Sequence, residues 1–112
     1  MSALALQHCS KLSHDAAAMN NDQASTFIQQ LDPQWLLDTK EQSISFTYAF
    51  ENYYQTIAFV NVIAQIAHQQ DHHPELRVAY NRCTVTYSTH KVDGLSINDF
   101  ICAAKINAAQ NL

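Results

Sequence analysis

The sequence predicts an α+β domain: a four-stranded antiparallel sheet with three helices on one face, in the order α-β-β-α-β-β-α. Three observations predict this fold class. Residues 43–50 alternate between apolar and polar, residues 53–67 repeat apolar side chains at helical spacing, and short polar turns separate the strands. Pairs of strands with helices between them are typical of an antiparallel sheet covered by helices on one side.

Length and composition favour a single domain spanning residues 1–112, with residues 1–11 expected to be frayed. The hydrophobic fraction of 47% is enough to build a core, and the formal net charge is −4. Because the chain has no Lys/Arg cluster, we expect neither direct nucleic-acid binding nor attachment to an anionic membrane. The three cysteines form no CxxC pair, and no secretory signal or membrane span is seen, so we predict a cytoplasmic protein.

The first half of the chain is expected to form one helix and two strands. Ser13 is the predicted N-cap of a helix that runs to Leu31, where Asp32-Pro33 ends it. A short strand at 35–37 and a polar turn follow. The alternation over 43–50 then predicts a half-buried strand. Its apolar face carries Ile44, Phe46, Tyr48 and Phe50.

The second half begins with a long helix that Asn52 is expected to cap and that must end by Pro74. Alternating residues then predict strands at 76–80 and 83–89, joined by a tight connection.

The chain ends with a turn and a third predicted helix. Asp93-Gly94, with the only glycine in the sequence, is the predicted turn. Ser96 is expected to cap the last helix, with Asp99 three residues on as its capping-box partner. The apolar side of this helix consists of Ile97, Phe100, Ile101, Ala104 and Ile106.

Three histidines are predicted to meet at one edge of the sheet. His72 and His73 lie where the long helix gives way to the third strand, and His90 follows the fourth strand. Because these strands are expected to be antiparallel neighbours, the start of one lies beside the end of the other. Two adjacent histidines that meet a third across a hairpin favour a catalytic role over a structural one.

Other roles are open for some of these residues. His72 could cap the long helix, because a cationic histidine suits a helix C-terminus. His68 and His72 are four residues apart and could bind a metal with His90, although Asp71 is the only nearby carboxylate. For Asp99 we favour a capping role alone.

The ordered set of these residues resembles the pterin-4a-carbinolamine dehydratase family. The family pattern is His-His-Pro, five residues, an aromatic, nine residues, His and a later Asp. The matching residues here are His72, His73, Pro74, Tyr80, His90 and Asp99. The chain departs from the family at His68, where an acid is common, at Leu76, where some members have tryptophan, and at Gln34, where glycine is common.

The resemblance implies a dehydratase that converts a 4a-hydroxytetrahydropterin to the quinonoid dihydropterin and water, in tetrahydrobiopterin recycling. The departing hydroxyl must gain a proton and N5 must lose one, and histidine can do both near neutral pH. No metal or redox cofactor is implied. All three histidines are candidate catalytic residues: we expect His72 and His90 to be the acid/base pair and His73 mainly to hold the pterin. The other implied substrate contacts are Asp71, Ser88, Thr89 and Lys91.

The resemblance also implies partners and a second class of function. Family members are dimers or tetramers, so a homo-oligomer is expected. A protein partner could come from the aromatic amino-acid hydroxylase pathway. Alternatively the chain could be a dimerisation cofactor, or coactivator, for a homeodomain transcription factor. A third alternative is a role in pterin or molybdopterin metabolism without a hydroxylase partner.

Overall fold

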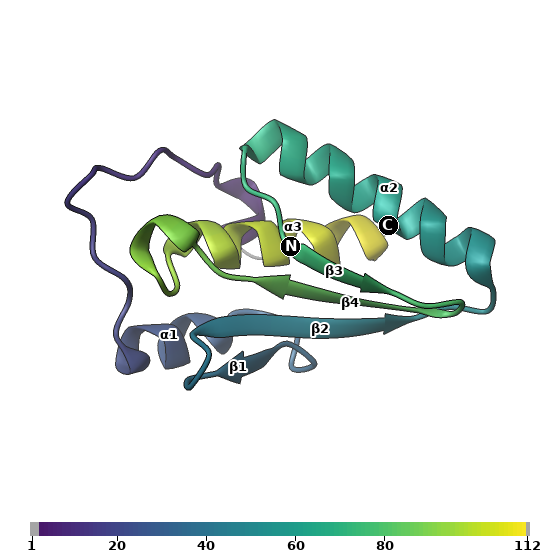
Figure 1. Cartoon of the computed structure of the whole chain (residues 1–112), viewed down its shortest axis with the longest axis horizontal. Helices are drawn as coiled ribbons and strands as arrows, with labels where there is room; N and C mark the ends of the chain where they lie inside the picture. Colours follow the sequence, from purple (N-terminus) through teal and green to yellow (C-terminus); the bar gives the residue numbers. More distant parts are fainter. Residues whose placement is uncertain (1–2, 112) are drawn as a thin grey trace.

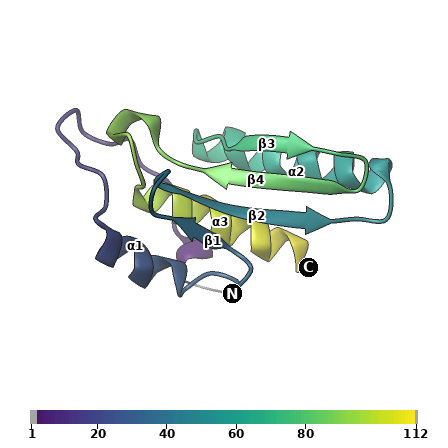
Figure 2. The same ribbon diagram turned by 60° about the horizontal axis from the view of Figure 1, so that its bottom comes forward.

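A computed structural model describes residues 3–111 and confirms the predicted fold class, with four antiparallel strands and three α-helices. The helices cover one face of the sheet (Figures 1 and 2). Two short 3-10 helices, η1 and η2, complete the described part of the chain. The elements in order are η1 (Leu4–Leu6), α1 (Asn21–Ile28), β1 (Leu36–Asp38), β2 (Ser43–Ala49), α2 (Tyr53–Gln70), β3 (Glu75–Val78), β4 (Arg82–Tyr87), η2 (His90–Val92) and α3 (Ile97–Gln110).

The strand order is β1-β2-β4-β3, so β4 lies between β2 and the edge strand β3. Val85 is opposite Phe46 of β2 on one side and opposite Leu76 of β3 on the other. The β3–β4 hairpin therefore places the beginning of β3 beside the end of β4, as the sequence predicted. This arrangement brings residues 72–75 close to residues 86–90.

The core lies between the helices and the apolar face of the sheet. On that face Ile44, Phe46 and Tyr48 are buried, in agreement with the predicted alternation. The C-terminal helix α3 is the most deeply packed helix, and Phe100 and Ile106 are fully buried. On the opposite face of the sheet the Thr47 and Thr84 hydroxyls form a hydrogen bond of 2.9 Å across β2 and β4.

The helix caps predicted for the second half of the chain are confirmed. The Asn52 side chain accepts a hydrogen bond from the Gln55 amide at 2.9 Å and begins α2. Ser96 and Asp99 form the capping box at the start of α3, where the Ser96 amide donates to Asp99 Oδ2 at 2.9 Å. These caps fix the ends of the two helices nearest the histidines.

The first helix is shorter than predicted, because it begins at Asn21 and not after Ser13. Its capping box is formed by Asn20 and Gln23, with a 2.8 Å bond from the Gln23 amide to Asn20 Oδ1. The Met19 amide donates to the Leu95 carbonyl at 2.8 Å, a bond that draws the preceding segment towards the start of α3 instead of into a helix.

Part of the segment expected to be frayed at the N-terminus packs against the rest of the protein. Leu4 and Ala5 are buried, and Lys105 Nζ of α3 donates to the Ala5 carbonyl at 2.9 Å. Residues 7–19, here called the strap, then run along the molecule to α1 without regular secondary structure, as Figure 1 shows in purple and blue. Within residues 3–111, no helix combines the length and apolar character needed to cross a bilayer.

Candidate active site

The end of α2 sets the direction of the histidine pair. Asp71 adopts the left-handed conformation (φ 51°, ψ 44°), and its amide donates to the carbonyls of Ala67 and His68. The His72 amide donates to the Ala67 carbonyl at 3.1 Å. A left-handed residue of this kind ends a helix sharply while satisfying its last carbonyls. The chain therefore leaves α2 in a fixed direction, with His72 and His73 before Pro74.

His72 turns inward to a carboxylate. Its Nε2 lies 2.6 Å from Oδ1 of Asp99, and its side chain is only 14% exposed. The imidazole stacks on the ring of Tyr87, with centroids 5.2 Å apart and an interplanar angle of 26°. The Tyr87 hydroxyl donates to the His72 carbonyl at 3.3 Å, so both the ring and the backbone of His72 are held.

Asp99 is fully buried, and hydrogen bonds reach both of its carboxylate oxygens. Oδ1 faces His72, while Oδ2 accepts from the Thr89 hydroxyl at 2.8 Å and from the Ser96 amide at 2.9 Å. Since the Thr89 proton goes to Asp99, the Ser96 hydroxyl donates to Thr89 Oγ1 at 2.7 Å. Asp99 is therefore more than the capping residue predicted from sequence.

The pKa of His72 is raised above its usual value by this environment. Burial acts to lower the pKa, but the hydrogen bond and the charge of Asp99 outweigh it. Cys9 and Asp71 contribute in the same direction as Asp99. Protonated His72 is consequently favoured at a pH where an isolated histidine would be mostly neutral.

His73 faces a different hollow from His72 and shares it with His90. This hollow has a volume of about 360 Å³ and is lined by His73, Pro74, Glu75, Thr86, Ser88 and His90. Both histidines are exposed. The predicted proximity of His73 and His90 across the β3–β4 hairpin is therefore present, and Ser88 lies with them.

The fourth strand ends two residues earlier than the predicted range of 83–89. Strand β4 stops at Tyr87, and His90 begins the 3-10 helix η2. The cause is a tight turn in which the Thr89 amide donates to the Gly94 carbonyl at 2.7 Å and Asp93 is left-handed (φ 50°). The amide and carbonyl of Thr89 are thus used within the turn.

A second cavity of about 510 Å³ lies on the His72 side of the site. Asp71, Thr89 and Lys91, all predicted substrate contacts, line it with His72. The rest of the lining includes Cys9, Ser10, Lys11 and Leu12 of the strap, Gln69 and Gln70 of α2, and Asn98 of α3. The predicted site residues are therefore divided between two neighbouring hollows instead of meeting in one.

The strap, together with Asp99, is what sequence reasoning missed. Lys91 Nζ donates to the Leu12 carbonyl at 2.5 Å, and Asn98 bonds both the amide and the carbonyl of Ser10, at 3.2 and 2.9 Å. These partners are about 80 residues or more apart in sequence, so no local pattern reveals them. The only available signal was the spacing of Asp99 in the motif.

No set of metal ligands is formed by these side chains. Among residues 3–111 no group of three or more His, Cys, Asp or Glu is arranged to hold a metal ion, and this includes His68, His72 and His90. His68 instead lines a separate surface hollow on α2 with Asn61, Ala64 and Gln65. The site thus combines one imidazole, that of His72, held by the buried carboxylate of Asp99, with two exposed imidazoles, those of His73 and His90, in the neighbouring hollow.

Comparison with known proteins agrees with the class of protein that the fold and the histidine motif define. The family described as "Pterin 4 alpha carbinolamine dehydratase" matches residues 17–109. The chain therefore belongs to the pterin-4a-carbinolamine dehydratase family. All six residues of the motif lie within the matched range.

Relatives from several bacteria are similar over nearly the whole chain. A protein of Nitrosomonas eutropha, provisionally named pterin-4-alpha-carbinolamine dehydratase, is 45% identical over 93% of this chain and 90% of its own length. A protein of Legionella pneumophila with the same provisional name is 43% identical over 95% of this chain and 94% of its own length.

Solved structures share the fold. A crystal structure described as a transcriptional coactivator/pterin dehydratase from Brucella melitensis has a TM-score of 0.76 and 30% identity, covering 81% of this chain and 96% of that one. A pterin dehydratase-like protein identified as a RuBisCO assembly factor in the alpha-carboxysome has a TM-score of 0.57 and 17% identity. It covers 88% of this chain and 94% of that one, a likeness of fold alone.

Proposed function

We propose that the protein catalyses the dehydration of a 4a-hydroxytetrahydropterin to the quinonoid dihydropterin and water, in tetrahydrobiopterin recycling. The observation that carries the proposal is the position of the three motif histidines at one end of the β3–β4 hairpin, where His72 contacts the buried Asp99 and His73 and His90 line one hollow. Membership of the pterin-4a-carbinolamine dehydratase family supports the same reaction.

The two proton transfers fall to different histidines in this proposal. His72, whose pKa Asp99 raises, is the general acid that protonates the C4a hydroxyl as the C–O bond breaks. His90, exposed on the neighbouring hollow, is the base that takes the proton from N5. The electron pair of N5 forms the new C=N bond, and the hydroxyl leaves as water.

His73 serves mainly to hold the pterin, since it lines the same hollow as His90 and Ser88. A hollow of about 360 Å³ is of the size that small-molecule sites commonly have, roughly 300–1,000 Å³. The proposal requires the reacting C4a–N5 bond to lie where the two hollows adjoin. Asp71, Thr89 and Lys91 then border the ligand from the larger cavity.

The test is a turnover assay on single variants with the 4a-carbinolamine made in situ by a tetrahydropterin-dependent hydroxylase. His72→Ala and His90→Ala should lower kcat, by up to the roughly 100- to 10,000-fold that general acid–base catalysis contributes. His73→Ala should mainly raise KM. His14→Ala, which removes an exposed histidine of the strap, is the matched control. Wild-type kcat in both His72→Ala and His90→Ala would reject the mechanism.

A protein-binding role is the second candidate, favoured by the apolar side chains around the edge strand β3. Val78 and Tyr80 are exposed there, and the Thr56 hydroxyl of α2 donates to the Tyr80 carbonyl at 2.9 Å. An edge strand with exposed apolar residues can extend its sheet onto another chain. The Brucella protein is described as a coactivator as well as a dehydratase.

For this chain we propose that the β3 edge joins copies of the protein into a dimer or tetramer. Light scattering coupled to size exclusion should show an oligomer that Val78→Lys weakens and His73→Ala leaves unchanged. A wild-type monomer at micromolar concentration would reject it. Pull-downs with the Val78 and His73 variants would show whether a foreign protein partner uses the same edge.

A further inference from the structure

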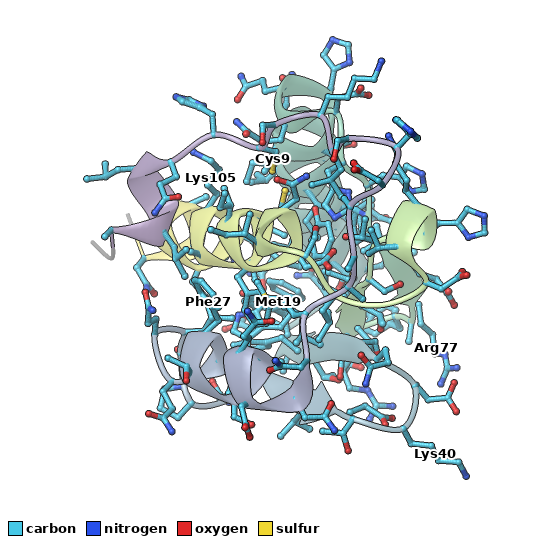
Figure 3. The ribbon with its side chains drawn as sticks, turned by 90° about the vertical axis from the view of Figure 1, so that its left-hand side faces the viewer. Cys9, Met19, Phe27, Lys40, Arg77 and Lys105 are labelled. Atoms are coloured by element: carbon cyan, nitrogen blue, oxygen red, sulfur yellow. The ribbon has the colours of Figure 1, made fainter. Side chains whose placement is uncertain are left out.

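Two of the three cysteines, far apart in sequence, meet beside the candidate site. Cys9 Sγ of the strap lies 3.5 Å from Cys102 Sγ of α3. Cys9 is half-buried and lines the 510 Å³ cavity, whereas Cys102 is fully buried in the core. Figure 3 shows Cys9 on the N-terminal strap where it passes α3. One thiol is therefore open to a small reagent and the other is enclosed in the core.

The strap is fixed at Cys9 and at the residue that follows it, and this holds Cys9 Sγ beside Cys102 Sγ in the folded protein. The Cys9 amide donates to Gln70 Oε1 of α2 at 2.7 Å, and the next residue, Ser10, is held by two bonds to Asn98. From 3.5 Å, a disulfide requires the sulfurs to approach to about 2.05 Å. A rotation of side chains and a small shift of the strap can supply this movement, because Cys9 lies in irregular structure.

The surroundings distinguish the two thiols chemically. The pKa of Cys9 is lowered, chiefly by the hydrogen bond with Cys102, and His72 and Lys105 favour its thiolate further. The pKa of Cys102 is raised by its contact with Cys9 and by burial. The thiolate is the reactive form of cysteine, so the accessible sulfur is also the more nucleophilic of the two.

We propose that Cys9 is an oxidation site for peroxides and that Cys102 is its resolving partner, so that oxidation closes a Cys9–Cys102 disulfide. The Cys9 thiolate attacks the O–O bond of the peroxide and becomes a sulfenic acid, and the oxygen that leaves takes up a proton as water or an alcohol. Cys102 then attacks the Cys9 sulfur. The S–O bond breaks, and the hydroxyl departs as water with the Cys102 proton.

The disulfide would tie the strap to α3 beside His72. Cys9 belongs to the strap residues that line the cavity, and Cys102 Sγ lies 3.9 Å from the His72 carbonyl. In a reducing compartment the bond would form under peroxide stress and be reversed by thiol exchange. This inference concerns the folded chain and does not depend on the proposed pterin reaction.

Peptide mapping gives a direct test, because trypsin separates the three cysteines. Cys9 lies in peptide 1–11, Cys83 in 83–91 and Cys102 in 92–105. The native protein is treated with hydrogen peroxide, its remaining thiols are alkylated under acidic denaturing conditions, and it is digested without reductant. Peptides 1–11 and 92–105 should appear joined and should separate on reduction. Cys83, buried in β4, should react at least about tenfold more slowly.

Two variants provide the controls. Cys83→Ala retains the pair and should cross-link at the wild-type rate. Cys102→Ala should stop at the Cys9 sulfenic acid, detectable by dimedone labelling. Cys9 found as sulfinic acid without the cross-link, or joined to a second molecule in a dimer on a non-reducing gel, would overturn the proposal. Free thiols on both peptide 1–11 and peptide 92–105, at peroxide concentrations that oxidise Cys83, would also overturn the proposal.

Discussion

His72 Nε2 lies 2.6 Å from Oδ1 of Asp99, and this contact joins the end of α2 to the first turn of α3. Asp99 is fully buried, and its other oxygen accepts two further hydrogen bonds. A buried carboxylate held in this way is a fixed hydrogen-bond partner for one ring nitrogen of the imidazole. It determines which nitrogen of His72 carries a proton and how strongly that proton is retained.

Asp99→Asn should impair the site while keeping its shape. The amide has nearly the same size but no charge, so the pKa of His72 should fall and its protonated form should be less populated. We expect turnover of the carbinolamine to drop by about tenfold to a hundredfold, part of what acid–base catalysis contributes. NMR titration of the His72 ring checks the pKa directly.

The control for Asp99→Asn is Asp93→Asn, which alters an exposed acid in the turn before α3. Asparagine tolerates the left-handed conformation found at this position, so the turn should be preserved. Wild-type turnover is expected. An unchanged His72 pKa in Asp99→Asn would mean that the charge of Asp99 does not govern this histidine.

The stability of the protein should depend on pH through His72. Its pKa in the folded state is raised above the value of 6.5 for an isolated histidine, so the folded state binds the proton more tightly than the unfolded chain. The stabilisation is fully present below about pH 6.5 and is lost as the pH rises through the folded-state pKa. Urea unfolding between pH 5.5 and 8 should show a decline in wild type that is reduced in Asp99→Asn. A decline of equal size in both proteins would assign it to other groups.

Thr89→Val should destabilise the protein although valine has almost the same shape. The Thr89 hydroxyl is buried and donates to Asp99 while it accepts from Ser96. Without this hydroxyl, Asp99 Oδ2 and the Ser96 hydroxyl each lose one hydrogen-bond partner. The loss should lower the free energy of unfolding by about 1–3 kcal/mol. Urea unfolding measures the loss, and Thr47→Val, on the exposed face of β2, should cost less.

Local signals predicted much of the fold. The alternation in β2 and the caps at Asn52 and Ser96 involve residues close in sequence, and all three are confirmed. The predicted start of α1 is wrong because serine and asparagine are both good N-cap residues, so Ser13 and Asn20 could each begin the helix. The choice between them depends on the bond from the Met19 amide to the Leu95 carbonyl, a contact between distant segments.

In the candidate site, too, local patterns could be predicted from the sequence and contacts between distant segments could not. The meeting of His73 with His90 follows from hairpin geometry, which the sequence pattern could supply. The contact of His72 with Asp99 depends on how α3 packs against the end of α2, and a helix sequence does not encode its neighbour's position. For this reason the sequence predicts one shared site for His72 and His73, which are adjacent in sequence. In the structure each of them lines a different cavity.

Gly94→Ala tests why the only glycine lies in the turn before α3. The left-handed residue of that turn is Asp93, so the glycine is not required for an unusual backbone conformation. A glycine is needed here because a larger residue has no room. A Cβ added at Gly94 would lie 2.8 Å from Cβ of Ala18 in the strap and 3.4 Å from Gln42 Oε1. We expect Gly94→Ala to cost about 1–3 kcal/mol of stability, as overpacking of a close contact does.

The double variant Gly94→Ala/Ala18→Gly separates this steric cause from an effect on the turn. Removing the Ala18 methyl group takes away the nearest atom that the new Cβ meets, so part of the lost stability should return. Unfolding of the two single variants and the double variant in urea gives the coupling energy between the positions. A double variant whose loss equals the sum of the single losses would show that the glycine serves the turn itself and not the approach of the strap.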